Sequence, residues 1–320
     1  MMSANAYETQ DFIMNTNVEQ RIISDYASEI YSAAVKELHR LENAMSFYRE
    51  ASEVSLLNRN VGGEPVKLSK EMMFVLEQAK HYSRLSENAF NIMLSPLIQL
   101  WRKAGEDNKV PSNDDVERTL TLCSDDNLLL DIDKDTAYLT KKGSMIDLGG
   151  IGKGYAADIC CDIYKAMGAA SAFINLGGNV KAIGNRADGS PWTIGIQHPD
   201  RPRGNCYCAI MCSDVSVVTS GGYERYQEID GVKYHHILDG VTGYPSATDL
   251  KSVTVISHSS TQADALSTAA FVMGLVKGTD LIYESGCVGA IFFTASNEIY
   301  MTKRIRQYLK LLERFACYEV

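Results

Sequence analysis

The residue types best suited to chemistry gather first in a glycine-rich stretch between Asp147 and Asp158. It reads Asp-Leu-Gly-Gly-Ile-Gly-Lys-Gly-Tyr-Ala-Ala-Asp and contains four glycines, one lysine and two carboxylates. Met145–Ile146 ends an apolar run that predicts a strand, and the apolar residues from Tyr155 onward recur with helical period. Free N–H groups at a helix N-terminus favour anions, so the stretch indicates phosphate binding. A glycine turn that only lets a helix pack on a sheet would explain the same residues.

Two common phosphate motifs do not match this stretch. A Walker loop requires glycine at the place of Asp147 and Ser or Thr at the place of Gly154. The dinucleotide fingerprint requires glycine or alanine at the place of Tyr155. The loop therefore belongs to neither class.

A second candidate site is the pair Asp264 and Thr268, four residues apart near the start of an expected helix. Residues at this spacing lie on one helix face, so a carboxylate and a hydroxyl point the same way. Oxygen ligands with room for waters or phosphate oxygens suit Mg²⁺. The alternative is that Asp264 only stabilises the helix N-terminus.

A third candidate is His236, which precedes a turn at Thr242–Pro245. Histidine titrates near neutrality and can act as a general base. A hydrogen-bonded strand histidine without catalytic function explains the same position. Glycine and small polar residues also cluster at Asn175–Asn179 and at Thr219–Tyr223, both at the edges of expected strands.

The elements that position these residues indicate an α+β chain, helical early and sheet-rich later, without a regular βαβ rhythm. We expect one domain over residues 1–320; a weakly marked boundary near residue 125 leaves two lobes open. The expected elements are a strand at Phe12–Thr16, helices opening at Asp25, Ser69, Ser112, about Tyr155 and about Thr261, hairpins at 128–140 and 223–237, and a strand pair at 288–293 and 299–301.

Composition narrows the classes of function. The chain has 320 residues, 45% of them hydrophobic, and a formal charge of −9, which argues against a nucleic-acid partner. No zinc spacing occurs among the eight cysteines, which we expect to be reduced core thiols. No apolar run of about 20 residues suggests a membrane span. The N-terminus shows no signal peptide, so we expect a cytoplasmic protein.

Taken together and in order, the motifs resemble the ApbE-type flavin transferases over most of the chain, from Met14 to about Gly274. No single motif is decisive, but their order is specific. The motifs are Met14–Thr16, Tyr48 with Ser52–Asn58, Asp147–Ala156, Asn175–Gly178, Thr219–Gly221, His236–Asp239 with Thr242–Pro245, and Ala263–Thr268.

The resemblance implies an ApbE-like fold with the ligand site in a cleft, and a Mg²⁺-dependent enzyme that cleaves FAD. Such an enzyme transfers FMN to a Ser or Thr hydroxyl of an acceptor flavoprotein and releases AMP. It implies His236 as the catalytic histidine. It implies metal ligation by Gly150, Asp264, Ser267 and Thr268. The positions implied to line the FAD site are Met14, Tyr48, Ala89, Phe90, Asn91, Asp147, Lys153 and Leu238.

Two positions depart from the family pattern. The family commonly has proline at the place of Gly240 and aspartate at the place of Asn91. We expect the first departure to loosen a turn beside His236 and the second to affect a ligand contact, and neither removes an implied metal ligand. Two alternative functions remain open, namely hydrolysis of FAD to FMN and AMP, and binding of FAD without chemistry.

Overall fold

The structure, a computed structural model that describes residues 6–320, is built on a nine-stranded sheet. The strand order is β1-β2-β6-β7-β10-β13-β14-β15-β17, and neighbours are antiparallel except for the parallel pair β15–β17. The strands of this sheet are β1 Ala6–Ile13, β2 Thr16–Ile23, β6 Ser171–Leu176, β7 Asn179–Ile183, β10 Ser216–Gly221, β13 Leu250–Ser257, β14 Gly289–Thr294, β15 Glu298–Met301 and β17 Ala316–Glu319.

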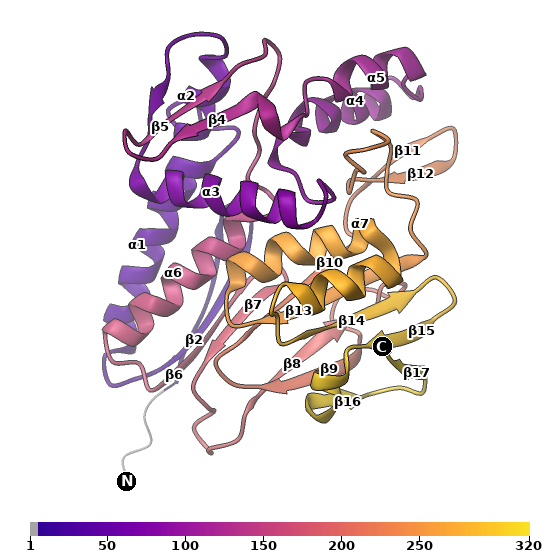
Figure 1. Ribbon diagram of the computed structural model, residues 1–320. Helices are drawn as coiled ribbons and strands as arrows, with labels where there is room; N and C mark the ends of the chain where they lie inside the picture. The colour runs from indigo at the N-terminus through magenta and orange to yellow at the C-terminus, as the bar shows by residue number, and fades with distance from the viewer. Residues whose placement is uncertain (1–5) are drawn as a thin grey trace.

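Helices cover one face of the sheet (Figure 1). The α1, α6 and α7 helices pack against the strands, and α3 contacts α7 from above. The helices are α1 Ala27–Met45, α2 Glu53–Arg59, α3 Lys70–Leu85, α4 Ser95–Glu106, α5 Asn113–Leu120, α6 Gly152–Ala166 and α7 Ser260–Glu284, with 3₁₀ turns at Ile92–Leu94, Asp125–Asn127 and Lys303–Tyr308.

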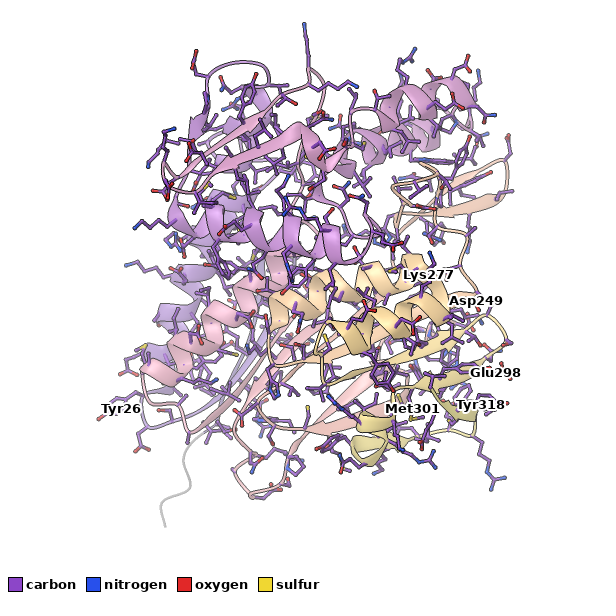
Figure 2. The ribbon with its side chains drawn as sticks, in the orientation of Figure 1. Tyr26, Asp249, Lys277, Glu298, Met301 and Tyr318 are labelled. Carbon is purple, nitrogen blue, oxygen red and sulfur yellow. The ribbon has the colours of Figure 1, made fainter. Side chains whose placement is uncertain are left out.

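Smaller sheets complete the molecule. The three-stranded sheet, in the order β16-β9-β8, covers part of the other face of the large sheet, because Tyr207 of β9 shares an apolar cluster with Ile256 of β13 and Phe293 of β14. At the C-terminal edge, Tyr318 donates to Glu298 at 3.4 Å, and both are labelled in Figure 2. The remaining strands are β3 Val66–Lys67, β4 Leu128–Asp131, β5 Thr136–Leu139, β8 Trp192–Gln197, β9 Cys206–Cys212, β11 Tyr226–Ile229, β12 Val232–His235 and β16 Leu309–Leu311.

Side-chain caps explain where several helices begin. The hydroxyls of Ser52, Ser69 and Ser112 accept from the backbone N–H three residues on, at 3.0, 3.2 and 3.2 Å, and begin α2, α3 and α5. The sequence predicted the last two of these starts. The predicted α+β class is confirmed, since helices and a largely antiparallel sheet form separate layers.

The N-terminal strand expected at Phe12–Thr16 is wrong. Met14 and Asn15 have φ angles of 54° and 57°, so they form the tight turn of the β1–β2 hairpin. The apolar residues on either side were misread as one strand because the turn carries no glycine. This hairpin pairs with β6 although α1 to α5 intervene in the chain, and the boundary near residue 125 stays a prediction.

One helix bears on the expectation that the chain contains no membrane span. Within residues 6–320, α7 is the one helix long and apolar enough to cross a membrane, but 56% of its most apolar window is buried inside the protein. A mostly buried helix against a sheet is a core helix, so the described residues contain no clear membrane span. All eight cysteines lie in the described part and are free, six of them buried, as the sequence predicted.

Candidate flavin and metal site

The glycine-rich stretch leads into a helix, as predicted, but this helix, α6, begins inside the stretch at Gly152, so that Lys153 and Gly154 lie in its first turn. The strand expected at Met145–Ile146 is absent. The side chain of Asn58 takes the place of a neighbouring strand: it accepts from the N–H of Ile146 at 2.8 Å and donates to its carbonyl at 2.9 Å. Asp147 then donates its N–H to the carbonyl of Ile92 at 2.9 Å. The segment is extended and held on one side by an amide, which periodicity alone cannot reveal.

The glycine loop offers fewer free N–H groups than the sequence suggested. Gly149 donates to Asp147 Oδ1 at 2.8 Å, and Gly152 donates to the carbonyl of Leu148 at 2.7 Å. Gly154 donates to Asp264 Oδ2, also at 2.8 Å. Three of the four glycines therefore bond within the chain, and the charge of Lys153 becomes the main feature of the loop that favours an anion.

Gly154 joins the loop to α7, and Figure 1 shows α6 and α7 side by side. A Cβ placed on Gly154 would lie 2.4 Å from the carbonyl oxygen of Ser260 and 2.7 Å from Cβ of Asp264. Any other residue would push the two helices apart. The glycine is therefore required by a close helix crossing that brings the loop to Asp264.

Asp264 is a buried carboxylate, with 6% of its surface exposed. Burial raises its pKa, and the positive charge of Lys153 and the Gly154 N–H oppose that rise. Within the described residues no Lys, Arg or His lies within 4.0 Å to form an ion pair with it, although Lys153 lies close enough to act on its charge. A buried negative charge without an ion-pair partner is a fitting position for a cation.

The other oxygens near Asp264 are hydroxyls from two elements. Ser267 Oγ donates to the Asp264 carbonyl oxygen at 3.0 Å. Ser220 Oγ, on β10, lies 2.8 Å from Ser267 Oγ and 3.1 Å from Thr268 Oγ1. The described residues contain no cluster of three or more His, Cys, Asp or Glu side chains that could hold a metal. One carboxylate with hydroxyls suits Mg²⁺, which keeps waters and phosphate oxygens among its ligands, so the donor set fits the predicted ion.

Ser220 is a site residue that the sequence reasoning missed. It lies in the Thr219–Tyr223 motif, whose small residues at a strand edge were noted without a function. The period of a strand would have placed its side chain opposite that of Thr219. Only the pairing of β10 with β7 and β13 shows that Ser220 faces α7.

The structure places the predicted FAD-lining residues on several elements. Phe90 is buried with its ring against the loop, because a Cβ on Gly150 would lie 3.1 Å from Phe90 Cε2. Ala89 beside it is also buried. Tyr48 is 73% exposed and contacts Phe47 edge-on, with the ring centroids 5.4 Å apart. Tyr48 is therefore open to a ring ligand, whereas Phe90 supports the loop from below.

Three other predicted residues have clear structural functions. The amide of Asn91 donates to the Cys123 carbonyl at 2.9 Å and accepts from the Met93 N–H at 2.7 Å, so both ends are occupied. Met14 donates its N–H to Glu42 Oε1 at 3.1 Å. Leu238 is buried in an apolar cluster and forms an isolated bridge with Pro245. Ligand binding by these residues stays a prediction.

His236 follows the β11–β12 hairpin that the sequence predicted. Its N–H and its ring Nδ1 both face the carbonyl oxygen of Arg225, at 3.1 and 3.0 Å. A carbonyl only accepts, so Nδ1 carries the proton and Nε2 keeps its lone pair. The side chain is exposed, which leaves Nε2 open to a ligand.

The pKa of His236 is lowered to about 4, first by lost solvation and also by the positive charges of Arg225, His235 and Lys153, while the bond to the Arg225 carbonyl opposes the change. Because the residue is exposed, solvent screens part of this shift. The histidine is therefore neutral at pH 7 in the free protein, the form a general base requires.

Lys153 is a positively charged residue whose charge acts on three of the predicted site residues. Burial raises the pKa values of Asp147 and Asp264 and lowers that of His236, and the positive charge of Lys153 acts to lower the pKa of all three groups. Burial is the larger effect on Asp147 and raises its pKa. Lys153 Nζ donates to the Gly149 carbonyl at 2.6 Å. Residues of the loop, of α7 and of the segment after the hairpin thus lie near enough to one lysine to be affected by its charge.

A cavity of about 390 Å³ lies away from this position, against β1, β2 and β6. It contains none of the predicted site residues, and the predicted cleft around the site stays a prediction. The cavity is lined by Glu8, Thr9, Gln10, Glu19, Gln20, Arg21 and Phe173.

Solved structures share this arrangement of layers. A crystal structure of the ApbE protein of Thermotoga maritima matches with a TM-score of 0.88 and 33% identity, over 95% of this chain and 99% of the other. The apo flavinyl transferase ApbE of Pseudomonas stutzeri matches with a TM-score of 0.83 and 29% identity, over 95% and 96% of the two chains. The fold is thus that of the flavin-transferring enzymes.

The family is also shown by sequence. The ApbE family model matches residues 14–292, and the chain belongs to this family. It is 33% identical to the FAD:protein FMN transferase of Treponema pallidum, over 96% of this chain and 88% of that protein. It is 33% identical to the FAD:protein FMN transferase of Klebsiella pneumoniae, over 94% and 93%. The protein is an enzyme of the transferase class.

Proposed function

We propose that the protein transfers FMN from FAD to a Ser or Thr hydroxyl of an acceptor flavoprotein, in a Mg²⁺-dependent reaction that releases AMP. The observation that carries the proposal is His236, whose ring is held by a backbone carbonyl with Nε2 free, and which shares with the buried Asp264 the influence of the Lys153 charge. The names of the relatives in Treponema and Klebsiella support FAD as the donor.

The reaction forms one bond and breaks one. The acceptor hydroxyl attacks the phosphorus of the FMN half, a new P–O bond forms, and the pyrophosphate P–O bond breaks with its electron pair leaving on AMP. His236 Nε2 accepts the hydroxyl proton, and the Arg225 carbonyl keeps the ring oriented. Lys153 faces the phosphates and offsets their charge.

The metal site in this proposal comprises Asp264 and Thr268, with the Gly150 carbonyl as a further oxygen. When bound, Mg²⁺ supplies charge neutralisation on the phosphate oxygens. The close crossing at Gly154 holds Asp264 rigidly for this purpose. Aromatic stacking on the exposed ring of Tyr48 provides a contact for the flavin or the adenine.

Hydrolysis of FAD is the second candidate, and one observation favours it. His236 is exposed, so water as well as a protein hydroxyl can reach Nε2. The outcome then depends on whether an acceptor excludes water when it docks. We also propose a cytoplasmic location, supported by the eight free cysteines.

The test is incubation with FAD, Mg²⁺ and a flavoprotein acceptor that has one reactive Thr, with the Thr→Val acceptor as the matched control. Mass analysis should show an FMN phosphoester on the Thr acceptor and an equal amount of AMP. Free FMN and AMP in equal yield with both acceptors would instead establish hydrolysis. Intact FAD that stays bound would establish a binding protein.

A further inference from the structure

Three hydroxyls form a continuous hydrogen-bonded chain beneath the predicted metal position. Ser220 Oγ on β10 lies between Ser267 Oγ, at 2.8 Å, and Thr268 Oγ1, at 3.1 Å. Ser267 in turn donates to the Asp264 carbonyl at 3.0 Å. Ser267 is fully buried, and the other two hydroxyl residues are half-buried.

The number of protons fixes the direction of each bond in this chain. A hydroxyl has one proton to donate. Ser267 uses its proton on the Asp264 carbonyl, so it can only accept from Ser220. Ser220 has then used its own proton and must accept from Thr268. The order of donation is Thr268 to Ser220 to Ser267 to the carbonyl.

This order decides which hydroxyl can bind a cation. The proton of Thr268 points at Ser220, so the lone pairs of Thr268 Oγ1 are left for other partners. Ser267 has given its proton and one lone pair to the chain, and none of its surface is exposed. Thr268 is thus the hydroxyl prepared for a cation, and Ser267 serves as a link behind it.

We propose that Ser220 is a positioning residue for the metal site: it accepts the proton of Thr268 and so presents the lone pairs of Thr268 to a divalent cation. The inference rests on the proposed Mg²⁺ site and deepens it. It assigns Ser267 to the hydrogen-bonded chain and leaves Asp264 and Thr268 as the side-chain ligands. A residue on β10 thereby affects how tightly the ligands on α7 bind the cation.

A purely structural function is the competing explanation, because the same bonds tie β10 to α7. The chain offers a matched control for it. Thr219, the neighbour of Ser220, bonds through Oγ1 to Thr254 Oγ1 at 2.8 Å and ties β10 to β13 instead. Thr219→Val removes a hydroxyl bond of the same strand at a pair that contains no proposed ligand.

The experiment is calorimetric titration of the full-length protein with Mg²⁺ alone, without FAD. Ser220→Ala should weaken Mg²⁺ binding by about 10- to 100-fold, the usual effect of removing a group that orients a metal ligand. Ser220→Thr keeps a hydroxyl and should restore most of the affinity. Thr219→Val should bind Mg²⁺ like the unmodified protein.

Melting temperatures without metal separate orientation from folding. If Ser220→Ala fails to fold, Ser220→Cys fills the same space with a weak hydrogen-bond acceptor and should weaken Mg²⁺ binding in the same sense. Unchanged affinity in a folded Ser220→Ala or Ser220→Cys protein would overturn the inference. Asp264→Asn distinguishes a failure of this inference from a failure of the proposed metal site. If Asp264→Asn abolishes Mg²⁺ binding while the Ser220 variants bind normally, the inference about Ser220 is wrong and the metal site stands. If Asp264→Asn also binds normally, the proposed metal site itself is wrong.

Discussion

The two sides of the site are held in very different ways. On one side, Asp264 is buried on α7, receives the Gly154 N–H, and is backed by a chain of hydroxyls. On the other side, His236 is exposed at the end of a hairpin and is oriented by one carbonyl. In the function we propose, burial and many bonds hold a metal and phosphates in fixed positions, whereas exposure lets a large acceptor approach. We therefore propose that the buried side binds the metal and phosphates and that the exposed side transfers the proton.

The largest expected effect is on the buried side. Asp264→Asn keeps an acceptor for the Gly154 N–H but removes the charge, so Mg²⁺-stimulated FAD cleavage should fall to the metal-free rate. The melting temperature without metal should not fall, because a buried charge is removed. Turnover assays at increasing Mg²⁺, with the exposed Asp162→Asn on α6 as control, measure this. Full Mg²⁺ stimulation in Asp264→Asn would show that Asp264 is not a metal ligand.

A smaller effect is expected at Lys153, between the two sides. Lys153→Gln removes the positive charge that acts on Asp147, His236 and Asp264. The KM for FAD should rise by about 10-fold, which corresponds to roughly 1.4 kcal/mol. Lys165→Gln, exposed near the end of the same helix, is the control and should leave KM unchanged. An equal rise in both variants would show that the effect is general electrostatics.

The smallest expected effect is a displacement of pH profiles. The pKa of His236 in the free protein is lowered to about 4, so the acid limb of kcat/KM should lie below the ordinary histidine value. Bound phosphates are negative and favour the imidazolium, so the limb of kcat should lie at higher pH than that of kcat/KM. Steady-state rates from pH 4 to 8 test the order of the two limbs. The reverse order would mean that His236 is not the base.

His236 also affects how the free energy of unfolding depends on pH. A histidine whose pKa is lowered on folding binds fewer protons in the native than in the unfolded state. The free energy of unfolding should therefore decrease as pH falls from the ordinary value near 6.5 towards 4. His236→Asn should lose this part of the pH dependence, which urea unfolding at several pH values measures.

The sequence predicted the local parts of the site better than their surroundings. Helical period and capping residues located α3, α5 and α6 because those signals lie within a few residues. The Met14–Asn15 turn was missed because non-glycine residues with positive φ leave no mark in composition. The strand expected at Ile146 failed because the amide of Asn58, 88 residues away, replaces the neighbouring strand.

In the candidate site, too, the sequence predicted the features set by neighbouring residues and missed those set by long-range pairing. Spacing alone placed Asp264 and Thr268 on one helix face, but the contribution of Ser220 depends on which strand pairs beside α7. The tautomer of His236 likewise depends on the hairpin bringing Arg225 opposite it. Long-range pairing of this kind has no signature in a single sequence. For that reason the sequence predicted too many free N–H groups for phosphate binding in the glycine-rich stretch. One of them, that of Gly154, donates to Asp264.

The most direct test of the division between binding and proton transfer is a paired measurement on His236→Asn. FAD affinity is measured by calorimetry at saturating Mg²⁺, and single-turnover transfer is measured on the preformed complex after addition of the acceptor. His258→Asn is the control, because its ring also faces a backbone carbonyl, that of Asp214 at 3.1 Å. The account predicts little change in FAD affinity and a transfer rate lower by about 10²- to 10⁴-fold. Weakened FAD binding with an unchanged transfer rate in the bound complex would contradict it.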